Sequence, residues 1–213
     1  MRASGILLPV SSLPGKYGIG SFSEEAYKFV DFLKDSKQQY WQILPIGPTS
    51  YGDSPYQSFS TYAGNPYFIS LEELIEQGLL TEKECDKVDF GDKIDKVDYE
   101  KLYNGRFKLL KKAYKRSNIR EREEFKKFKD ENQYWLNDYA MFMAIKERFK
   151  GQSFDNWAED IKLRWGYSME YYQNELKEEI EFYEFVQYEF YRQWYKLKKY
   201  ANDNGVKIIG DIP

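Results

Sequence analysis

The chain has 213 residues, with 32 basic and 35 acidic side chains and a formal net charge of −3. It has no basic block of the kind that nucleic acid requires, so nucleic acid is not an expected partner. It also contains no histidine. This absence excludes Ser-His and Cys-His nucleophiles and the usual zinc sites, and leaves carboxylates, Tyr, Lys and one cysteine as reactive groups.

The single cysteine, Cys85, allows no disulfide framework, which suits a reducing cytoplasm. It lies in the charged stretch TEKECDK, which we expect to be helical, and we interpret it as a bystander. The sequence shows no secretory leader and no apolar run long enough to cross a membrane. We therefore expect a soluble, cytoplasmic protein without a membrane partner.

The first 44 residues predict one βαβ unit. Residues 5–10 form a buried-strand pattern that should end near Pro9, because proline cannot donate to a central ladder. The sequence from Ser21 to Glu24 matches a capping box, and an apolar face follows up to Ser36. The apolar run at residues 40–44 predicts the next strand. A strand, a helix and a strand in this order predict two adjacent parallel strands.

Two long loops leave the carboxyl ends of these strands, at residues 11–20 and 45–66, and we expect both at one rim of the sheet. The second loop combines prolines and glycines with several aromatic residues. Its segment YGDSPYQS, residues 51–58, places aromatic faces beside small polar groups, as a carbohydrate site requires. Alternatively, the tyrosines only fix the loop to the domain. We interpret Asp53 as a turn residue.

The rest of the chain predicts a helical insertion and then a second βαβ unit. Residues 81–178 have apolar positions at helical spacing; within them, residues 119–132 are mostly charged and predict a solvated helix, and Gly151 suits a helix C′ position. A long helix should reach Asn202, and residues 206–213 form a third strand pattern.

These elements predict an α/β fold in three parts. Residues 1–80 hold the first strands and the candidate ligand loop, residues 81–178 the insertion, and residues 179–213 the helix and third strand. Three parallel strands cannot close an eight-stranded barrel, and a terminal strand with an exposed edge is an aggregation risk. We therefore expect the N-terminal part of a larger protein, truncated after its third strand.

Four stretches carry a resemblance to a known family. They are SGILLPVSSLPGKYGIGSF, QQYWQILPIGPTSYGDSPYQSFSTYAGNPYFISL, WLNDYAMFMAIKERFKG and GVKIIGDIP. In this order they resemble the 4-alpha-glucanotransferases called amylomaltase or disproportionating enzyme. The resemblance implies a (β/α)8 TIM barrel with helical insertions. It also implies transfer of α-1,4-glucan segments to the 4-hydroxyl of an acceptor sugar through a covalent glycosyl-enzyme, without a metal or organic cofactor.

The resemblance also assigns candidate residues. Ser54 and Tyr56 match positions that line donor subsites, and Tyr51 matches an aromatic residue of a secondary glucan site. Asp211 matches an aspartate that orients active-site neighbours. The family's catalytic carboxylates lie on later barrel strands, so no catalytic residue is assigned in this chain and the chain alone should be inactive. The implied partners are α-1,4-glucans and maltooligosaccharides.

Two alternatives remain open from the sequence. The chain could be a non-catalytic α-glucan-binding module built around residues 51–58. It could also be a structural helical protein with an α/β cap, whose aromatic residues all belong to the core. Glucan affinity separates the last alternative from the other two, and the reading frame beyond residue 213 separates an enzyme from a binding module.

Overall fold

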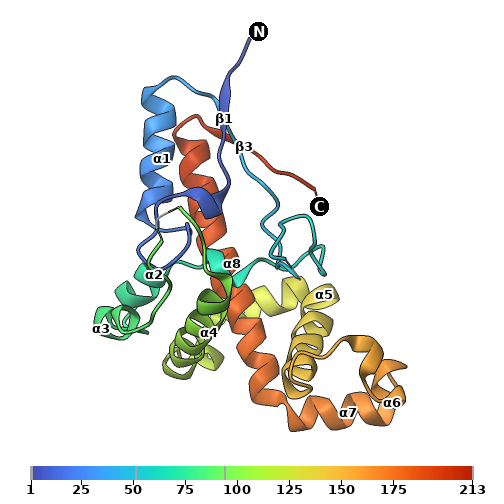
Figure 1. Ribbon diagram of the computed structural model, residues 1–213. Coiled ribbons are helices and arrows are strands. Elements are labelled where there is room, and N and C mark those ends of the chain that lie inside the picture. Colours follow the sequence, from blue (N-terminus) through green and yellow to red (C-terminus); the bar gives the residue numbers. More distant parts are fainter. Residues whose placement is uncertain (1, 51, 94, 213) are drawn as a thin grey trace. The chain divides into compact units, whose positions relative to one another are not determined.

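The computed structural model describes residues 2–50, 52–93 and 95–212. In this part of the chain a parallel sheet has three strands in sequence order: β1 (Gly5–Leu7), β2 (Tyr40–Gln42) and β3 (Lys207–Ile209) (Figure 1). Gly5 pairs with Tyr40, and Tyr40 pairs with Lys207. The predicted strands and their parallel order are confirmed, although each is only three residues long.

The helices of the described residues occupy most of the chain. They are α1 (Glu24–Asp35), α2 (Leu71–Glu76), α3 (Glu82–Asp86), α4 (Tyr99–Arg116), α5 (Glu123–Arg148), α6 (Glu159–Lys162), α7 (Gly166–Glu175) and α8 (Lys177–Asp203). Short 3-10 helices lie at Val10–Ser12, Pro66–Phe68, Ile119–Glu121 and Phe154–Asn156.

The chain divides into two compact units. The first holds residues 1–117 and 189–213, and the second holds residues 118–188. Helix α8 contributes residues to both. The division into residues 1–80, 81–178 and 179–213 stays a prediction.

The core of the first unit forms around the central strand. Trp41 of β2 is fully buried, and its indole Nε1 donates to the Leu8 carbonyl at 2.8 Å. Helix α1 packs against the C-terminal part of α8, where the Tyr27 and Tyr200 rings lie 5.1 Å apart. The outer strands are different, since Leu7 of β1 and Ile209 of β3 remain 54% and 43% exposed. The sheet is therefore covered at its centre and open at its edges.

Two helix ends differ from the predictions. The N-cap of α1 is Ser23, without a side-chain capping bond, so the capping box predicted from Ser21 is wrong. The reason is that the Phe22 amide is bonded outside the helix: it donates to the Phe68 carbonyl at 2.9 Å, and α1 begins only after Ser23. At the end of α5 the C-cap is Phe149, so Lys150 occupies C′, and Gly151 follows it with φ +77°.

The second unit is helical, and the stretch predicted as a solvated helix is helical but partly buried. The charged stretch 119–132 is a 3-10 turn followed by the first turns of α5, which continues to Arg148. Ile119 and Phe125 are buried, and the Phe125 ring packs on Tyr188 at 5.6 Å. The stretch is therefore amphipathic and packed on one side, since two of its three apolar residues are buried and the third, Phe128, is partly buried.

Candidate functional site

The loop at residues 45–66 is ordered by its own hydrogen bonds. Thr49 and Ser58 form an isolated antiparallel bridge, and the Asn65 amide donates to the Ile46 carbonyl at 2.9 Å. Ser58 donates to the Ser60 carbonyl at 2.8 Å. The loop starts shortly after β2, so these bonds fix it at the carboxyl-end edge of the sheet.

The aromatic residues of this loop fall into two groups. Tyr67 and Phe68, where the loop ends, are buried in the unit. By contrast, Tyr56, Phe59 and Tyr62 are 50%, 41% and 51% exposed. Aromatic faces beside hydroxyl and amide groups suit a sugar ring, whose C–H face packs on an aromatic surface. The loop thus offers aromatic surface that the core does not use.

Two predicted site residues meet directly. The Tyr56 hydroxyl donates to Oδ2 of Asp211 at 2.7 Å, and Asp211 lies two residues after the last residue of β3. This bond raises the pKa of Tyr56, because the phenol is the donor to a carboxylate. Ser54 Oγ accepts the Tyr56 backbone N–H at 3.3 Å. Ser54, Tyr56 and Asp211 therefore form one group at the edge where the strands end.

Asp53 shapes the turn that carries this group. Its φ of +52° lies in the left-handed region, and its amide donates to the Ser50 carbonyl at 3.1 Å. Its carboxylate accepts the Thr49 hydroxyl at 3.3 Å. Partial burial raises the pKa of Asp53, against the opposing effect of the Thr49 bond. These contacts agree with the interpretation of Asp53 as a turn residue.

Both candidate loops border one small cavity. Its volume is about 30 Å³, and its walls include Ser11 and Ile19 of the first loop and Thr49 and Pro55 of the second. The topology predicts this proximity, since parallel neighbouring strands end at the same edge of a sheet.

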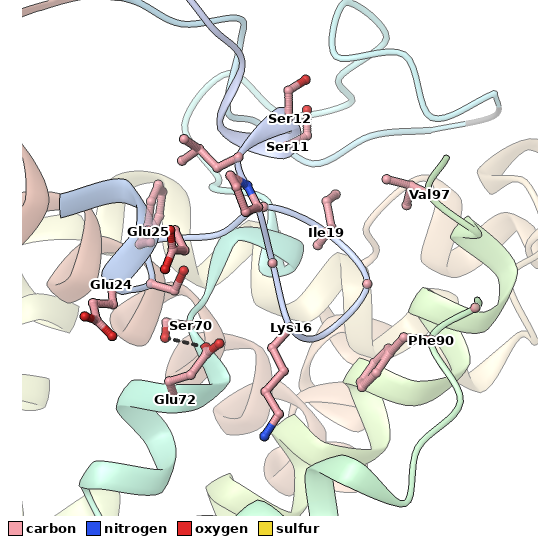
Figure 2. Close-up of a pocket in the computed structure, with 18 of the residues that line it drawn as sticks. Ser11, Ser12, Lys16, Ile19, Glu24, Glu25, Ser70, Glu72, Phe90 and Val97 are labelled. Atoms are coloured by element: carbon pink, nitrogen blue, oxygen red, sulfur yellow. Dashed lines mark hydrogen bonds between the residues drawn. The ribbon is translucent and has the colours of Figure 1, made fainter. Parts of the chain in front are cut away.

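A larger hollow of about 1340 Å³ also borders the first loop. Figure 2 shows Lys16 extending from the first loop, with Glu24, Glu25 and Glu72 on one side of it and Phe90 on the other. Three of its carboxylates have partners: Lys28 pairs with Glu24 and Glu25, and Ser70 donates to Glu72 at 2.9 Å. Its walls include none of Ser54, Tyr56 and Asp211. We therefore place the candidate site at the Tyr56 and Asp211 edge.

Tyr51, the remaining predicted site residue, lies outside the described residues. Sequence reasoning missed two contacts that hold this region. One is the bridge between Thr49 and Ser58, for which the sequence carries no signal. The other is Arg106 of α4, which reaches the main chain beside both loops. In the sequence of an amphipathic helix, nothing distinguishes a buried arginine from the solvated ones on the polar face.

Residues 8–213 match the family model described as 4-alpha-glucanotransferase. The chain belongs to the 4-alpha-glucanotransferase family. A 4-alpha-glucanotransferase of Clostridium butyricum is 52% identical over 204 residues, which are 96% of this chain and 42% of that protein. One from Thermus thermophilus is 43% identical over 216 residues, covering 100% and 42% respectively.

Solved structures of the family agree with the fold. Amylomaltase from Streptococcus agalactiae, solved in complex with acarbose, superposes with a TM-score of 0.94 at 43% identity, covering 100% of this chain and 43% of that one. Amylomaltase from Corynebacterium glutamicum superposes with a TM-score of 0.70 at 22% identity, over 98% of this chain and 29% of that one, which supports the fold alone.

The chain spans less than half of the length of each of these 4-alpha-glucanotransferases. This agrees with the predicted N-terminal portion, and the predicted family is confirmed. Within the described residues, no helix has the length and apolarity needed to span a membrane. The same part of the chain holds no group of three or more acidic, Cys or His side chains placed to bind a metal.

Proposed function

We propose that this chain forms the first part of an enzyme that transfers a segment of an α-1,4-glucan to the 4-hydroxyl of an acceptor glucose or maltooligosaccharide. The observation that carries the proposal is family membership over residues 8–213, together with half-exposed aromatic residues where the parallel strands end. The acarbose complex of the Streptococcus agalactiae amylomaltase adds support, since it shows that family member holding a ligand.

In this proposal the chain supplies substrate contacts. Tyr56 would present its ring to a donor sugar, with its hydroxyl fixed by Asp211 at 2.7 Å. Ser54 would hold the Tyr56 main chain and add a polar contact. Tyr51 would contribute to a secondary glucan contact. An aromatic ring whose hydroxyl is already bonded has few orientations, so little entropy is lost when a sugar binds.

The reaction would follow the retaining pathway. A carboxylate attacks the anomeric carbon and an acid protonates the leaving oxygen; the acceptor's 4-hydroxyl then displaces the carboxylate and gives its proton to the conjugate base of that acid. We assign neither carboxylate to this chain and expect both in a later part of the same reading frame. Closing a barrel with later strands would also cover the exposed edges at Leu7 and Ile209. The site would have to exclude water, so that a sugar and not water accepts the glycosyl group.

The test compares the product of the whole reading frame with residues 1–213 alone. Each is incubated with maltotriose, and the products are separated by chromatography. We expect the whole product to form glucose and longer maltooligosaccharides, and residues 1–213 to form neither. If the whole product leaves maltotriose unchanged, the proposal that it is a glucan-transferring enzyme is refuted. If that inactive product still binds amylose, the non-catalytic binding module replaces it; disproportionation by residues 1–213 alone would refute the placement of the carboxylates.

A further inference from the structure

Arg106 is a buried cation in the first unit. It lies in α4, and only 1% of its surface is exposed. Its Nε has no hydrogen-bond partner among the described residues. Burial lowers the pKa of Arg106 to about 10, so the guanidinium remains charged at neutral pH. Burying a charge is costly unless hydrogen bonds compensate, which raises the question of what this side chain does.

The guanidinium joins the two candidate ligand loops. NH1 donates to the Tyr17 carbonyl of the first loop at 3.3 Å, and NH2 donates to the Ile69 carbonyl just beyond the second. The adjacent Phe68 carbonyl accepts the Phe22 amide at 2.9 Å, so a main-chain bond links the same two segments. Both segments are therefore tied together at the base of the rim.

Close packing fixes the position from which Arg106 reaches out. A Cβ on the neighbouring Gly105 would lie 2.5 Å from Cγ1 of Val88, so α4 approaches this segment closely. The first loop is equally tight: a Cβ on Gly18 would lie 2.7 Å from Cβ of Phe90, and the Tyr17 and Phe90 rings meet edge to face at 6.0 Å. Figure 2 shows this loop passing from Ser11 to Lys16 and back beside Phe90.

We propose that Arg106 is a positioning residue, which sets the spacing of loops 11–20 and 45–66 so that both can contact one glucan chain. This inference rests on the proposed function. Arg106 touches no substrate in it and acts through the Tyr17 and Ile69 carbonyls. Arginine suits the task because its planar fork carries several fixed donors, whereas lysine places a single ammonium on a flexible stem.

The test uses the product of the whole reading frame with three variants. Arg106→Met keeps most of the side-chain volume and removes every donor. Arg106→Lys keeps the charge without the fork. Arg116→Met is the matched control, because Arg116 lies on the same helix and donates to the Leu79 carbonyl at 3.1 Å and to Glu84, away from both loops. Maltotriose disproportionation gives KM and kcat, and hydrogen exchange follows the amides of Gly20 and Phe22.

For Arg106→Met we expect a fall in kcat/KM of about 10- to 100-fold, mostly as a higher KM, with faster exchange at both amides. Arg106→Lys should show a smaller change in the same direction. Arg116→Met should lower the unfolding midpoint and leave KM and the two amides unchanged. If Arg106→Met does not fold, Arg106→Lys decides.

Wild-type KM and exchange in the foldable Arg106 variants would overturn the inference, as would an equal rise of KM in Arg116→Met. Failure of the proposed function is a different outcome, because there the wild-type protein leaves maltotriose unchanged. In that case the exchange rates of Gly20 and Phe22 decide about Arg106: equal rates in the wild type and the Arg106 variants overturn its role in fixing the loops.

Discussion

Tyr56 and Asp211 are 155 positions apart in the chain, yet the Tyr56 hydroxyl donates to the Asp211 carboxylate at 2.7 Å. One belongs to the loop that follows β2, and the other follows β3. The bond therefore connects the ends of two neighbouring strands across the rim. It also leaves the Tyr56 ring half exposed, so a ligand could pack on it.

We predict that Tyr56→Ala in the whole protein lowers kcat/KM for maltotriose. The loss of transition-state binding free energy should be about 1 to 3 kcal/mol, because the change removes both the ring and the bond to Asp211. Tyr56→Phe should cost less, about 1 kcal/mol, since only one hydrogen bond is lost. Steady-state kinetics measures both.

Asp211→Asn completes a double-mutant cycle with Tyr56→Phe, and we expect the two effects to be non-additive because the residues share one bond. Tyr195→Phe, an equally conservative change at an exposed tyrosine of α8, is the control and should retain wild-type kcat/KM. Wild-type activity of Tyr56→Ala would remove Tyr56 from the donor site.

Gly64→Ala should destabilise the first unit by about 1 to 3 kcal/mol, because overpacking a tight core forces neighbouring atoms to move. A Cβ on Gly64 would lie 2.1 Å from two atoms of the buried Phe190 ring, which itself packs on Phe22 at 5.3 Å. Urea unfolding followed by tryptophan fluorescence gives the change. Gly166→Ala is the control, since its Cβ meets nothing within 4 Å and it begins α7; an equal loss in both variants would contradict the packing argument.

The framework could be predicted from the sequence because it depends on local patterns. Three apolar runs bounded by proline or glycine predict the strands, and their alternation with helices predicts the parallel order. Apolar residues at helical spacing lie on both sides of Asn104 and Gly105, a pair typical of hairpins, and α4 runs through both residues. The segment at residues 51–58, which places aromatic residues beside small polar ones, is sufficient to mark this loop as the candidate ligand loop.

Pairings over long separations could not be predicted. Nothing local indicates that Tyr56 meets Asp211 or that Arg106 reaches the Tyr17 carbonyl. The predicted start of α1 was wrong for a related reason. The sequence at Ser21 fits the capping-box motif, but the Phe22 amide bonds to a distant carbonyl, and α1 starts later. Helical spacing does not reveal burial either: Tyr103 of α4, one residue after the fully buried Leu102, is 54% exposed.

Cys85 should resist alkylation in the native protein. It is fully buried in α3, and burial raises the pKa of its thiol to about 11, so very little reactive thiolate exists at pH 8. We expect iodoacetamide to modify it slowly in buffer and rapidly in denaturing urea, as measured by intact mass. Equal rates in the two conditions would show that Cys85 is accessible in the folded chain.

Glu84→Gln should destabilise the chain at neutral pH and much less in acid. Both oxygens of Glu84 accept from the Arg116 guanidinium at 2.8 Å, and Glu84 also closes a capping box with Thr81. The Arg116 bond is the largest of the effects that hold the pKa of Glu84 well below its usual range. A lowered folded-state pKa means that the stabilisation is complete above the unfolded pKa, about 4.3, and is lost as pH falls toward the folded value.

The wild type and Glu84→Gln are therefore compared by urea unfolding at pH 7 and pH 3, where the difference in unfolding free energy should be smaller at pH 3. Glu82→Gln is the control on the same helix: its carboxylate pairs with Lys16 at 2.6 Å, but both side chains are about half exposed or more. Such a pair contributes little because water screens it. A Glu84→Gln effect that is equal at both pH values would show that charge is not its origin.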